Sequence, residues 1–209
     1  MMSVLVLTDH GPATGKHAGA KSMSGDDVTT IRPYPGELEE RLEHRGRQLQ
    51  LRPIRPEDTP RHREFLSRVT PRDLYTRFFS GVHEVPESDV AHFTHIDYDR
   101  EMAFVAVAAG GAEAGDILGV ARVCADQGFR GAEFAVLVRS DLKGQGLGRV
   151  LMEKLIHYCR ERAIGELRGS VLMENAAMLR LAHALGFRLR GTEQNVGEIV
   201  LDLAPPGAP

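Results

Sequence analysis

Seven residues from Lys143 to Arg149 form the segment whose composition points most directly to chemistry. They read Lys-Gly-Gln-Gly-Leu-Gly-Arg, with a basic residue at each end. A short apolar, strand-like run at 134–138 precedes them, and apolar residues at helical spacing follow as far as Cys159. Backbone N–H groups in the first turn of a helix have no internal partner, and glycine lets an anion approach them closely. The segment therefore predicts an anion site, with the charge of Lys143 beside it.

Two common glycine-rich phosphate loops do not fit this sequence. A P-loop needs four residues between its first Gly and the Gly-Lys pair, followed by Ser or Thr. The nearest approach, residues 11–16, has three intervening residues and is followed by His17. A Rossmann turn needs Gly-x-Gly-x-x-Gly, whereas the glycines at 144, 146 and 148 alternate. The remaining pattern is a basic residue, two residues, Gly, one residue and Gly, at the end of a strand.

The elements that must position this loop can be read from periodicity and turn residues. We expect strands at 49–54, 102–109, 117–125, 131–138, 166–173, 187–192 and 198–203, and helices at 57–69, 71–79, 86–96, 146–163 and 175–185. Asn175 stands at the N-cap position of the last helix, and Gly186 stands at its end. This order of strands and helices predicts a mixed α/β sheet.

The loop pattern and the later Asn175…Leu185-Gly-Phe187 pattern together resemble the GNAT superfamily of acyl-CoA-dependent N-acyltransferases. The two motifs cover about residues 130–190. The resemblance implies a GNAT fold, in which a central mixed, mostly antiparallel sheet is flanked by helices and has a splayed central strand pair. It also implies acetyl-CoA as cosubstrate. The residues implied to bind it are Val136, Leu137, Val138, Lys143, Gly144, Gln145, Gly146, Leu147, Gly148, Arg149 and Asn175.

Each part of this set has its own implied role. In GNATs the pantetheine amides pair with the strand backbone, here 136–138, and a backbone N–H polarises the thioester oxygen. The N–H groups of 145–148 would hold the pyrophosphate. Asn175 would contact the pantetheine or only cap its helix, and the sequence leaves both readings open. Arg180 could reach a CoA phosphate, although an exposed helix position is the simpler reading.

Three further segments narrow the resemblance. They are Leu51-Arg-Pro-Ile-Arg-Pro-Glu-Asp58, Leu74-Tyr-Thr-Arg-Phe-Phe79 and Ala132-Glu-Phe-Ala-Val136. Together they are similar to the catalytic domain of Pat-type protein lysine acetyltransferases, over about residues 31–203. Those enzymes modify lysines of other proteins, notably acyl-CoA synthetases, and often carry a regulatory domain, which we do not expect within these 209 residues. We expect a disordered leader at 1–30, a GNAT domain at 31–203 and a Pro-rich tail at 204–209.

Transfer from a thioester to an amine requires a base, because only the neutral amine is a nucleophile. In the Pat-type family the Glu of the Ala-Glu-Phe-Ala-Val motif is the proposed general base, and Glu133 matches it. The alternative is a strand-end carboxylate that faces water or pairs with an Arg. Many GNATs carry a Tyr seven residues after the motif Asn as a general acid, but this chain has Ala182 there. No residue is assigned to the acid step, and neither His157 nor His183 replaces the Tyr.

The resemblance favours a lysine side chain of a protein, such as an acyl-CoA synthetase, as the acceptor. Direct transfer in a ternary complex is expected. A small amine remains an alternative acceptor, and a non-catalytic acyl-CoA sensor is an alternative function. The arginines at 61, 63, 68, 72 and 77 and the aromatics at 75, 78 and 79 lie where GNATs form one acceptor wall. They could dock an acidic surface and line a lysine channel, or form a solvated helix face over packed aromatics.

Composition limits the other partners. A net charge of −3 and a pI near 6.3 give no general attraction to nucleic acid or anionic membranes, and no apolar run reaches membrane-spanning length. Cys124 and Cys159 show no paired spacing with His, so we expect no metal site. The cytoplasm is the expected compartment. The sequence does not indicate an oligomeric state, the preferred acyl length or a role for the leader.

Overall fold

The computed structural model describes residues 32–79 and 85–203, and the predicted leader at 1–30 and tail at 204–209 lie outside this range. Eight strands form one sheet in the order β1-β2-β3-β4-β5-β6-β8-β7. Every pair is antiparallel except β5 and β6, which run parallel. The strands are β1 Glu40–His44, β2 Arg47–Pro53, β3 Glu101–Ala108, β4 Ile117–Ala125, β5 Gly131–Val138, β6 Glu166–Leu172, β7 Arg188–Glu193 and β8 Val196–Asp202.

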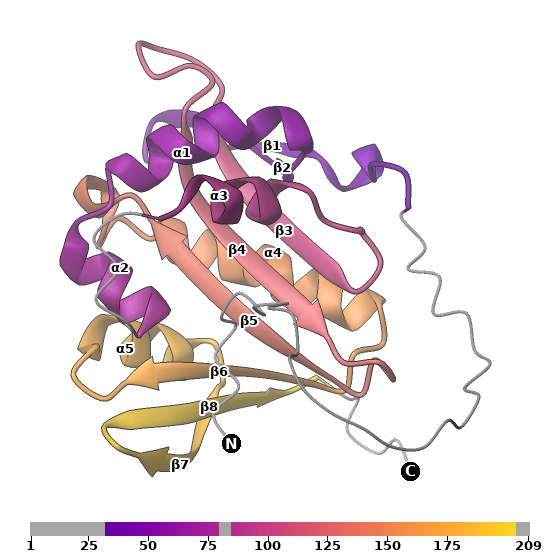
Figure 1. The fold of residues 1–209 in the computed structure, drawn as a ribbon, viewed down its shortest axis with the longest axis vertical. Helices are drawn as coiled ribbons and strands as arrows, with labels where there is room; N and C mark the ends of the chain where they lie inside the picture. The colour runs from indigo at the N-terminus through magenta and orange to yellow at the C-terminus, as the bar shows by residue number, and fades with distance from the viewer. Residues whose placement is uncertain (1–31, 80–84, 204–209) are drawn as a thin grey trace, which may run out of the picture.

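Helices cover both faces of the central strands (Figure 1). On one face lies α4 (Leu147–Glu161), packed against β3, β4 and β5. On the other lie α1 (Thr59–Ser67), α2 (Pro71–Phe78) and α3 (Glu87–Thr94), while α5 (Ala176–Ala184) follows β6. Because both faces are covered, β3 and β4 are almost continuously apolar and buried. No described helix is long and apolar enough to cross a membrane.

The sheet opens between β5 and β6. The two strands pair only from Gly131 to Glu133 on β5, opposite residues 166–168, whereas β4 stays paired with β5 as far as Val138. The Phe134 ring lies just beyond the last paired residue and packs against Phe187. A Cβ on Gly169 would lie only 2.6 Å from that ring. Glycine at 169 therefore leaves room for Phe134 at the point where the strands part, and the predicted splayed strand pair is confirmed.

The predicted elements are all present, with ends shifted by at most a few residues. The sequence analysis missed β1. Its residues are mostly charged and half or fully exposed, because an edge strand can keep its charges in water. The hairpin turn to β2 consists of Arg45 and Gly46, with φ of 51° and 75°. Two positive φ values are typical of a two-residue type I′ turn, so the Arg-Gly pair is the local signal that could have revealed the hairpin.

The Leu51–Asp58 segment that contributed to the resemblance has a structural role. Arg52 and Asp58 form a buried, bidentate pair with two N···O distances of 2.6 Å. Although burial opposes ionisation, the Arg52 guanidinium holds the pKa of Asp58 below its ordinary value. Asp58 also accepts a hydrogen bond from the backbone N–H of Arg55. The pair thus fixes the passage from β2 into α1, which forms part of the wall above β5.

Candidate functional site

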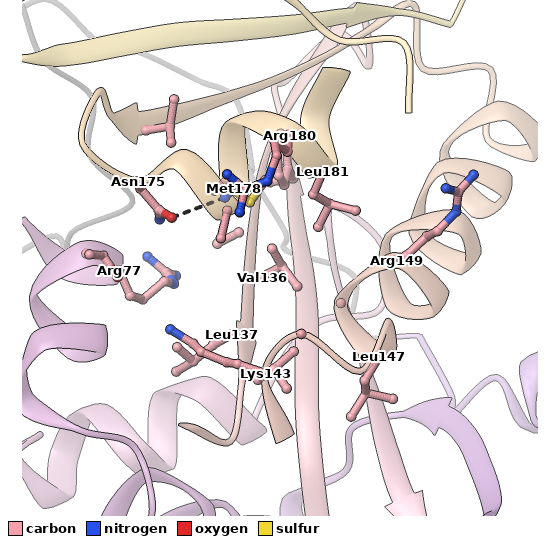
Figure 2. A pocket seen from close by; sticks show the side chains of 18 of the residues that line it. Arg77, Val136, Leu137, Lys143, Leu147, Arg149, Asn175, Met178, Arg180 and Leu181 are labelled. Carbon is pink, nitrogen blue, oxygen red and sulfur yellow. Dashed lines mark hydrogen bonds between the residues drawn. The ribbon is translucent and has the colours of Figure 1, made fainter. Parts of the chain in front are cut away.

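A cavity of about 360 Å³ occupies the fork between β5 and β6 (Figure 2). Its described wall carries four cationic side chains and one carboxylate, so it favours an anionic ligand. The cavity is lined by Thr76, Arg77, Phe79, Glu133, Phe134, Ala135, Val136, Leu137, Val138, Leu142, Lys143, Gly144, Gly146, Leu147, Gly148, Arg149, Ser170, Val171, Asn175, Ala177, Met178, Arg180 and Leu181. All the predicted site residues are among them except Gln145. The carbonyl of Gln145 points to His44 instead.

The glycine-rich loop enters α4 with its backbone donors unused. Gly144 and Gly146 have φ of 73° and 87°, a region that glycine adopts without strain, and Gly146 is the N-cap of α4. Among the hydrogen bonds between described residues, none uses the backbone N–H groups of residues 144–148. Five successive donors therefore remain for a ligand at the positive end of the α4 dipole.

The loop is tied to α2 through a small polar network. Lys143 forms an ion pair with Asp73, and Ser140 Oγ donates to Asp73 Oδ2 at 2.5 Å. Ser140 Oγ also accepts from the Thr70 backbone N–H at 2.9 Å. Burial acts to raise the pKa of Asp73, but Lys143 and Ser140 outweigh it and the pKa is lowered. The charge of Lys143 is thus shared between Asp73 and the anion site.

The edge of β5 that faces β6 is open beyond Glu133. Residues 134–138 hydrogen-bond with β4 on one side, but they have no ladder partner on the β6 side. The side chain of Leu137 is buried and those of Val136 and Val138 are half-buried. This segment can therefore offer backbone N–H and C=O groups to a ligand that carries amides, as an added strand does.

Asn175 is placed both to cap α5 and to contact a ligand in the cavity. Its Oδ1 accepts a hydrogen bond from the Met178 backbone N–H at 3.1 Å, so the capping role is confirmed. The residue also lines the cavity, beside Met178 and opposite Arg77 in Figure 2. Capping uses only the oxygen of the amide, so its nitrogen can still donate to a bound ligand.

Glu133 lies at the vertex of the fork. It is the last residue of β5 that pairs with β6, opposite Arg168, and Cys124 is its neighbour on β4. Strand alternation turns it to the α1–α3 face of the sheet, where it interacts electrostatically with Arg77 of α2. Burial lowers the pKa of the Arg77 guanidinium to about 10, Arg122 acts in the same direction, and Glu133 opposes both. A half-buried carboxylate and a desolvated guanidinium thus share one end of the cavity.

Behind this end lies a smaller cavity of about 30 Å³ that the sequence analysis did not foresee. His62, Arg77 and Arg122 line it together with apolar side chains. Arg122 is 6% exposed, stacks over Phe93 and pairs with Glu101 at 3.4 Å. Burial, with a smaller contribution from Arg122, lowers the pKa of His62 to about 3, so the imidazole is neutral at pH 7. These residues come from α1, α2 and β4, and no sequence motif connects them.

The arginine-rich segment from 61 to 79 divides into two parts. Arg63 and Arg68 form surface ion pairs, with Glu87 and with Glu64 and Asp116, and the exposed Arg61 pairs with the buried Asp58. Of the five arginines in the segment, only Arg77 lines the cavity in the described structure, together with Thr76 and Phe79. Arg61, Arg63 and Arg68 thus keep exposed side chains, a position compatible with both readings of the segment, whereas the last turn of α2 forms part of the cavity wall.

The position of the expected Tyr lies away from the described wall of the cavity. Ala182 is buried, and the described lining of the cavity contains no Tyr, His or Cys side chain. His157 lies on the surface and pairs with Glu161, and His183 is exposed.

Known proteins resemble this chain in sequence and in fold. The sequence pattern of the acetyltransferase (GNAT) family matches residues 69–187. The acetyltransferase PA5475 of Pseudomonas aeruginosa is 34% identical over 144 residues, which are 68% of this chain and 76% of the relative. An L-methionine sulfoximine/L-methionine sulfone acetyltransferase of the same species is 37% identical over 73 residues, which are 34% of this chain and 42% of the relative.

Solved structures agree. The GNAT domain of S. lividans PAT has a TM-score of 0.73 and 27% identity, over 81% of this chain and 99% of that domain. The yncA acetyltransferase of Salmonella typhimurium, solved with acetyl-CoA, shares the fold with a TM-score of 0.59 and 22% identity, over 77% and 97% of the two chains. With the anion cradle, the open strand edge and these matches together, the chain belongs to the GNAT family of acetyltransferases, enzymes that use acetyl-CoA.

Proposed function

We propose that this protein transfers the acetyl group of acetyl-CoA directly to a lysine side chain of another protein, with Glu133 as the general base. The observation that carries the proposal is the position of Glu133. It stands at the vertex of the fork, in the same cavity as the open edge of β5 and the free N–H groups of 144–148. One cavity thus contains a carboxylate and matching surfaces for the amides and the pyrophosphate of CoA.

The donor lies along the fork in this proposal. Backbone N–H groups of 144–148 and Lys143 hold the pyrophosphate, and Arg149 and Arg180 are near enough to the opening to meet other phosphate oxygens. The pantetheine amides pair with Val136–Val138, and Asn175 donates its amide nitrogen to the same arm. A backbone N–H of this segment polarises the thioester carbonyl.

The transfer step uses Glu133 to generate the nucleophile. Glu133 removes a proton from the lysine ammonium, and the neutral amine attacks the thioester carbonyl carbon. The C–S bond breaks as the C–N bond forms, the nitrogen sheds its second proton, and the CoA thiolate is protonated by water. A thiolate is a good leaving group at neutral pH, so the absence of a Tyr at 182 is compatible with turnover.

A protein acceptor is supported by the likeness to the PAT domain, which spans almost all of that domain at 27% identity. We extend the proposal to an acyl-CoA synthetase as target. The three segments at 51–58, 74–79 and 132–136 resemble Pat-type enzymes, which notably modify such synthetases. A cytoplasmic location would bring this enzyme together with such a target and with acetyl-CoA.

A small amine with a carboxylate is the second candidate acceptor, and one observation favours it. The Arg77 guanidinium is desolvated and stands beside Glu133, where it could pair with the carboxylate of an amino acid. The partial similarity to an L-methionine sulfoximine/L-methionine sulfone acetyltransferase agrees with this reading. In the protein reading, the same arginine would meet an acidic side chain near the target lysine.

Release of CoA from acetyl-CoA tests both acceptors. The wild-type enzyme is assayed with an acyl-CoA synthetase and, separately, with a panel of amino acids and polyamines. Turnover of small amines alone would reject the protein acceptor, whereas tight CoA binding without turnover of either class would indicate a sensor. Mass spectrometry of a lysate incubated with acetyl-CoA then identifies the modified lysines.

The variant Arg77→Gln separates the two acceptors further. If Arg77 binds a substrate carboxylate, we expect the KM for an amino-acid acceptor to rise about tenfold while the KM for acetyl-CoA stays constant, because a charge-assisted hydrogen bond is lost. Arg77→Lys keeps the charge without the fork geometry and should give an intermediate KM. Equal effects on both KM values would show that Arg77 supports the fold and not the acceptor.

A further inference from the structure

The β1–β2 hairpin reaches the glycine-rich loop through one side chain. His44, the last residue of β1, has its Nε2 2.8 Å from the Gln145 carbonyl oxygen. A carbonyl can only accept, so the imidazole donates with its proton on Nε2. His44 is 101 residues from Gln145 in the sequence. The contact therefore connects an edge hairpin with the centre of the anion cradle.

This hydrogen bond controls the direction of the Gly146 backbone N–H. In a trans peptide the C=O of one residue and the N–H of the next point in opposite directions. Fixing the Gln145 carbonyl toward His44 turns the Gly146 N–H away from His44. Gly146 lines the cavity, whereas Gln145 and His44 do not. The bond thus aims the Gly146 N–H at the anion site.

The same contact opposes a flip of the Gln145–Gly146 peptide. Gly144 and Gly146 flank Gln145, and glycines allow a peptide to flip at little cost. A flipped peptide would point the Gln145 carbonyl into the cradle, where its partial negative charge would repel a phosphate. The His44 ring also lies close to Gly146, because a Cβ at that position would be 3.4 Å from the ring. The imidazole therefore both binds one orientation and packs against the turn.

The hairpin itself is held in place on α4. Lys154 of α4 pairs with Glu40 of β1 at 2.9 Å, and its ammonium lies over the Phe104 ring. Leu42 packs against the hydrophobic core from the same face of β1 as His44. His44 is thus presented to the loop from a fixed support rather than from a loose edge.

We infer that His44 is a positioning residue for the donor, which holds the Gln145–Gly146 peptide in the orientation that binds the pyrophosphate of CoA. This inference rests on the proposed role of residues 144–148. His44 does not touch the reacting atoms, so it should affect donor affinity and not the chemical step.

Calorimetric titration of CoA tests the inference with two variants. His44→Phe keeps an aromatic ring but loses the donor, and we expect its Kd for CoA to rise about three- to tenfold, the value of one hydrogen bond. His44→Gln can place an amide N–H near the position of Nε2, and its Kd should stay within about twofold of wild type. Arg41→Ala, at an exposed position on the same strand, is the matched control and should bind as wild type.

Kinetics and thermal unfolding complete the test. In His44→Phe we expect the KM for acetyl-CoA to rise while kcat at saturating acetyl-CoA and the KM for the acceptor stay constant. A Kd for His44→Phe within twofold of wild type, or a His44→Gln variant as weak as His44→Phe, would overturn the inference. If the wild type itself did not bind CoA, the proposed function would fail as well, so the two failures can be told apart. Unchanged Tm values exclude misfolding as the cause.

Discussion

The two ends of the cavity in the fork between β5 and β6 are lined by different kinds of group. The end proposed for the donor is mostly backbone, with five N–H groups at 144–148 that no hydrogen bond between described residues uses, and an open strand edge at 134–138. The end proposed for the acceptor has charged side chains from separate elements, Glu133 from β5 and Arg77 from α2, with Arg122 from β4 in the smaller cavity behind them. The donor end can therefore tolerate many side-chain changes, whereas single substitutions at the acceptor end should alter the reaction or the acceptor.

One helix connects the two ends. The first turn of α2 contacts the loop through Asp73 and Lys143, and its last turn places Arg77 beside Glu133. A movement of α2 would thus change both sites at once. Substitutions at each end, and at the connection, can separate their contributions.

The largest effect is expected at the acceptor end, from Glu133→Gln. Removal of the base should lower kcat by roughly a hundredfold or more, because general base catalysis contributes that much. The Kd for CoA should stay within about twofold, since the proposal assigns binding of the donor to backbone groups. CoA release and calorimetry measure the two quantities, and Glu166→Gln is the control, because that carboxylate pairs with Arg190 and is not among the residues that line the cavity. An unchanged kcat would remove Glu133 from the mechanism.

The stability of the acceptor wall should depend on pH through His62. Its pKa is about 3 in the folded protein and about 6.5 when unfolded, so the unfolded chain takes up a proton first as the pH falls. The neutral His62 therefore contributes fully to the free energy of unfolding above pH 6.5, and this contribution is lost as the pH falls toward 3. Between pH 6.5 and 5 the free energy of unfolding should fall by about 2 kcal/mol from this group.

Denaturant unfolding at several pH values measures this slope. His62→Phe should remove it, because the aromatic ring fits between Phe65 and Phe93 without a titrating group. His157→Gln, at an exposed histidine, should keep it. The same slope in wild type and His62→Phe would contradict a buried, neutral His62.

The backbone character of the donor end predicts a moderate effect for Gly146→Ala. For a residue with a Cβ, the left-handed conformation that Gly146 adopts is less stable by about 1–2 kcal/mol. The new methyl group would also press on His44. The Kd for CoA should rise about tenfold, with kcat at saturation preserved. The control is Gly111→Ala, which has a similar φ of 77° in a remote turn with open space around it. Equal CoA binding by the wild type and Gly146→Ala would show that this turn does not hold the donor.

The smallest effect is expected at the connection, from Asp73→Asn. The change keeps a partner for Ser140 but removes the charge that competes for Lys143. Acetyl-CoA should then bind about threefold more tightly, and the gain should shrink at high salt because exposed charges are screened. Weaker binding would mean that Asp73 holds Lys143 in place for the phosphate rather than competing with it.

The sequence predicted the donor end far better than the acceptor end. Glycine spacing, the strand before it and the helix after it are local features, and Asn175 is a local cap, so contiguous residues encode them. For the proposed acceptor end, the sequence singled out Glu133 through a family motif and otherwise offered only the broad segment 61–79. Arg77 could not be separated from its neighbours, since the pairs of Arg63 with Glu87 and of Arg68 with Asp116 join distant segments and become visible only in the folded chain.

The edge strand β1 and His44 escaped detection for a related reason. A short, charged edge strand has little apolar periodicity, and the contact of His44 with Gln145 depends on how a hairpin docks on α4. By itself, the sequence determined the order of elements from β2 onward, the glycine-rich turn into α4 and the GNAT family, because backbone conformation and burial patterns are set within short windows. Only the tertiary structure decided which side chains surround Glu133 and what holds the loop, because strand register and helix packing bring together residues that are far apart in the chain.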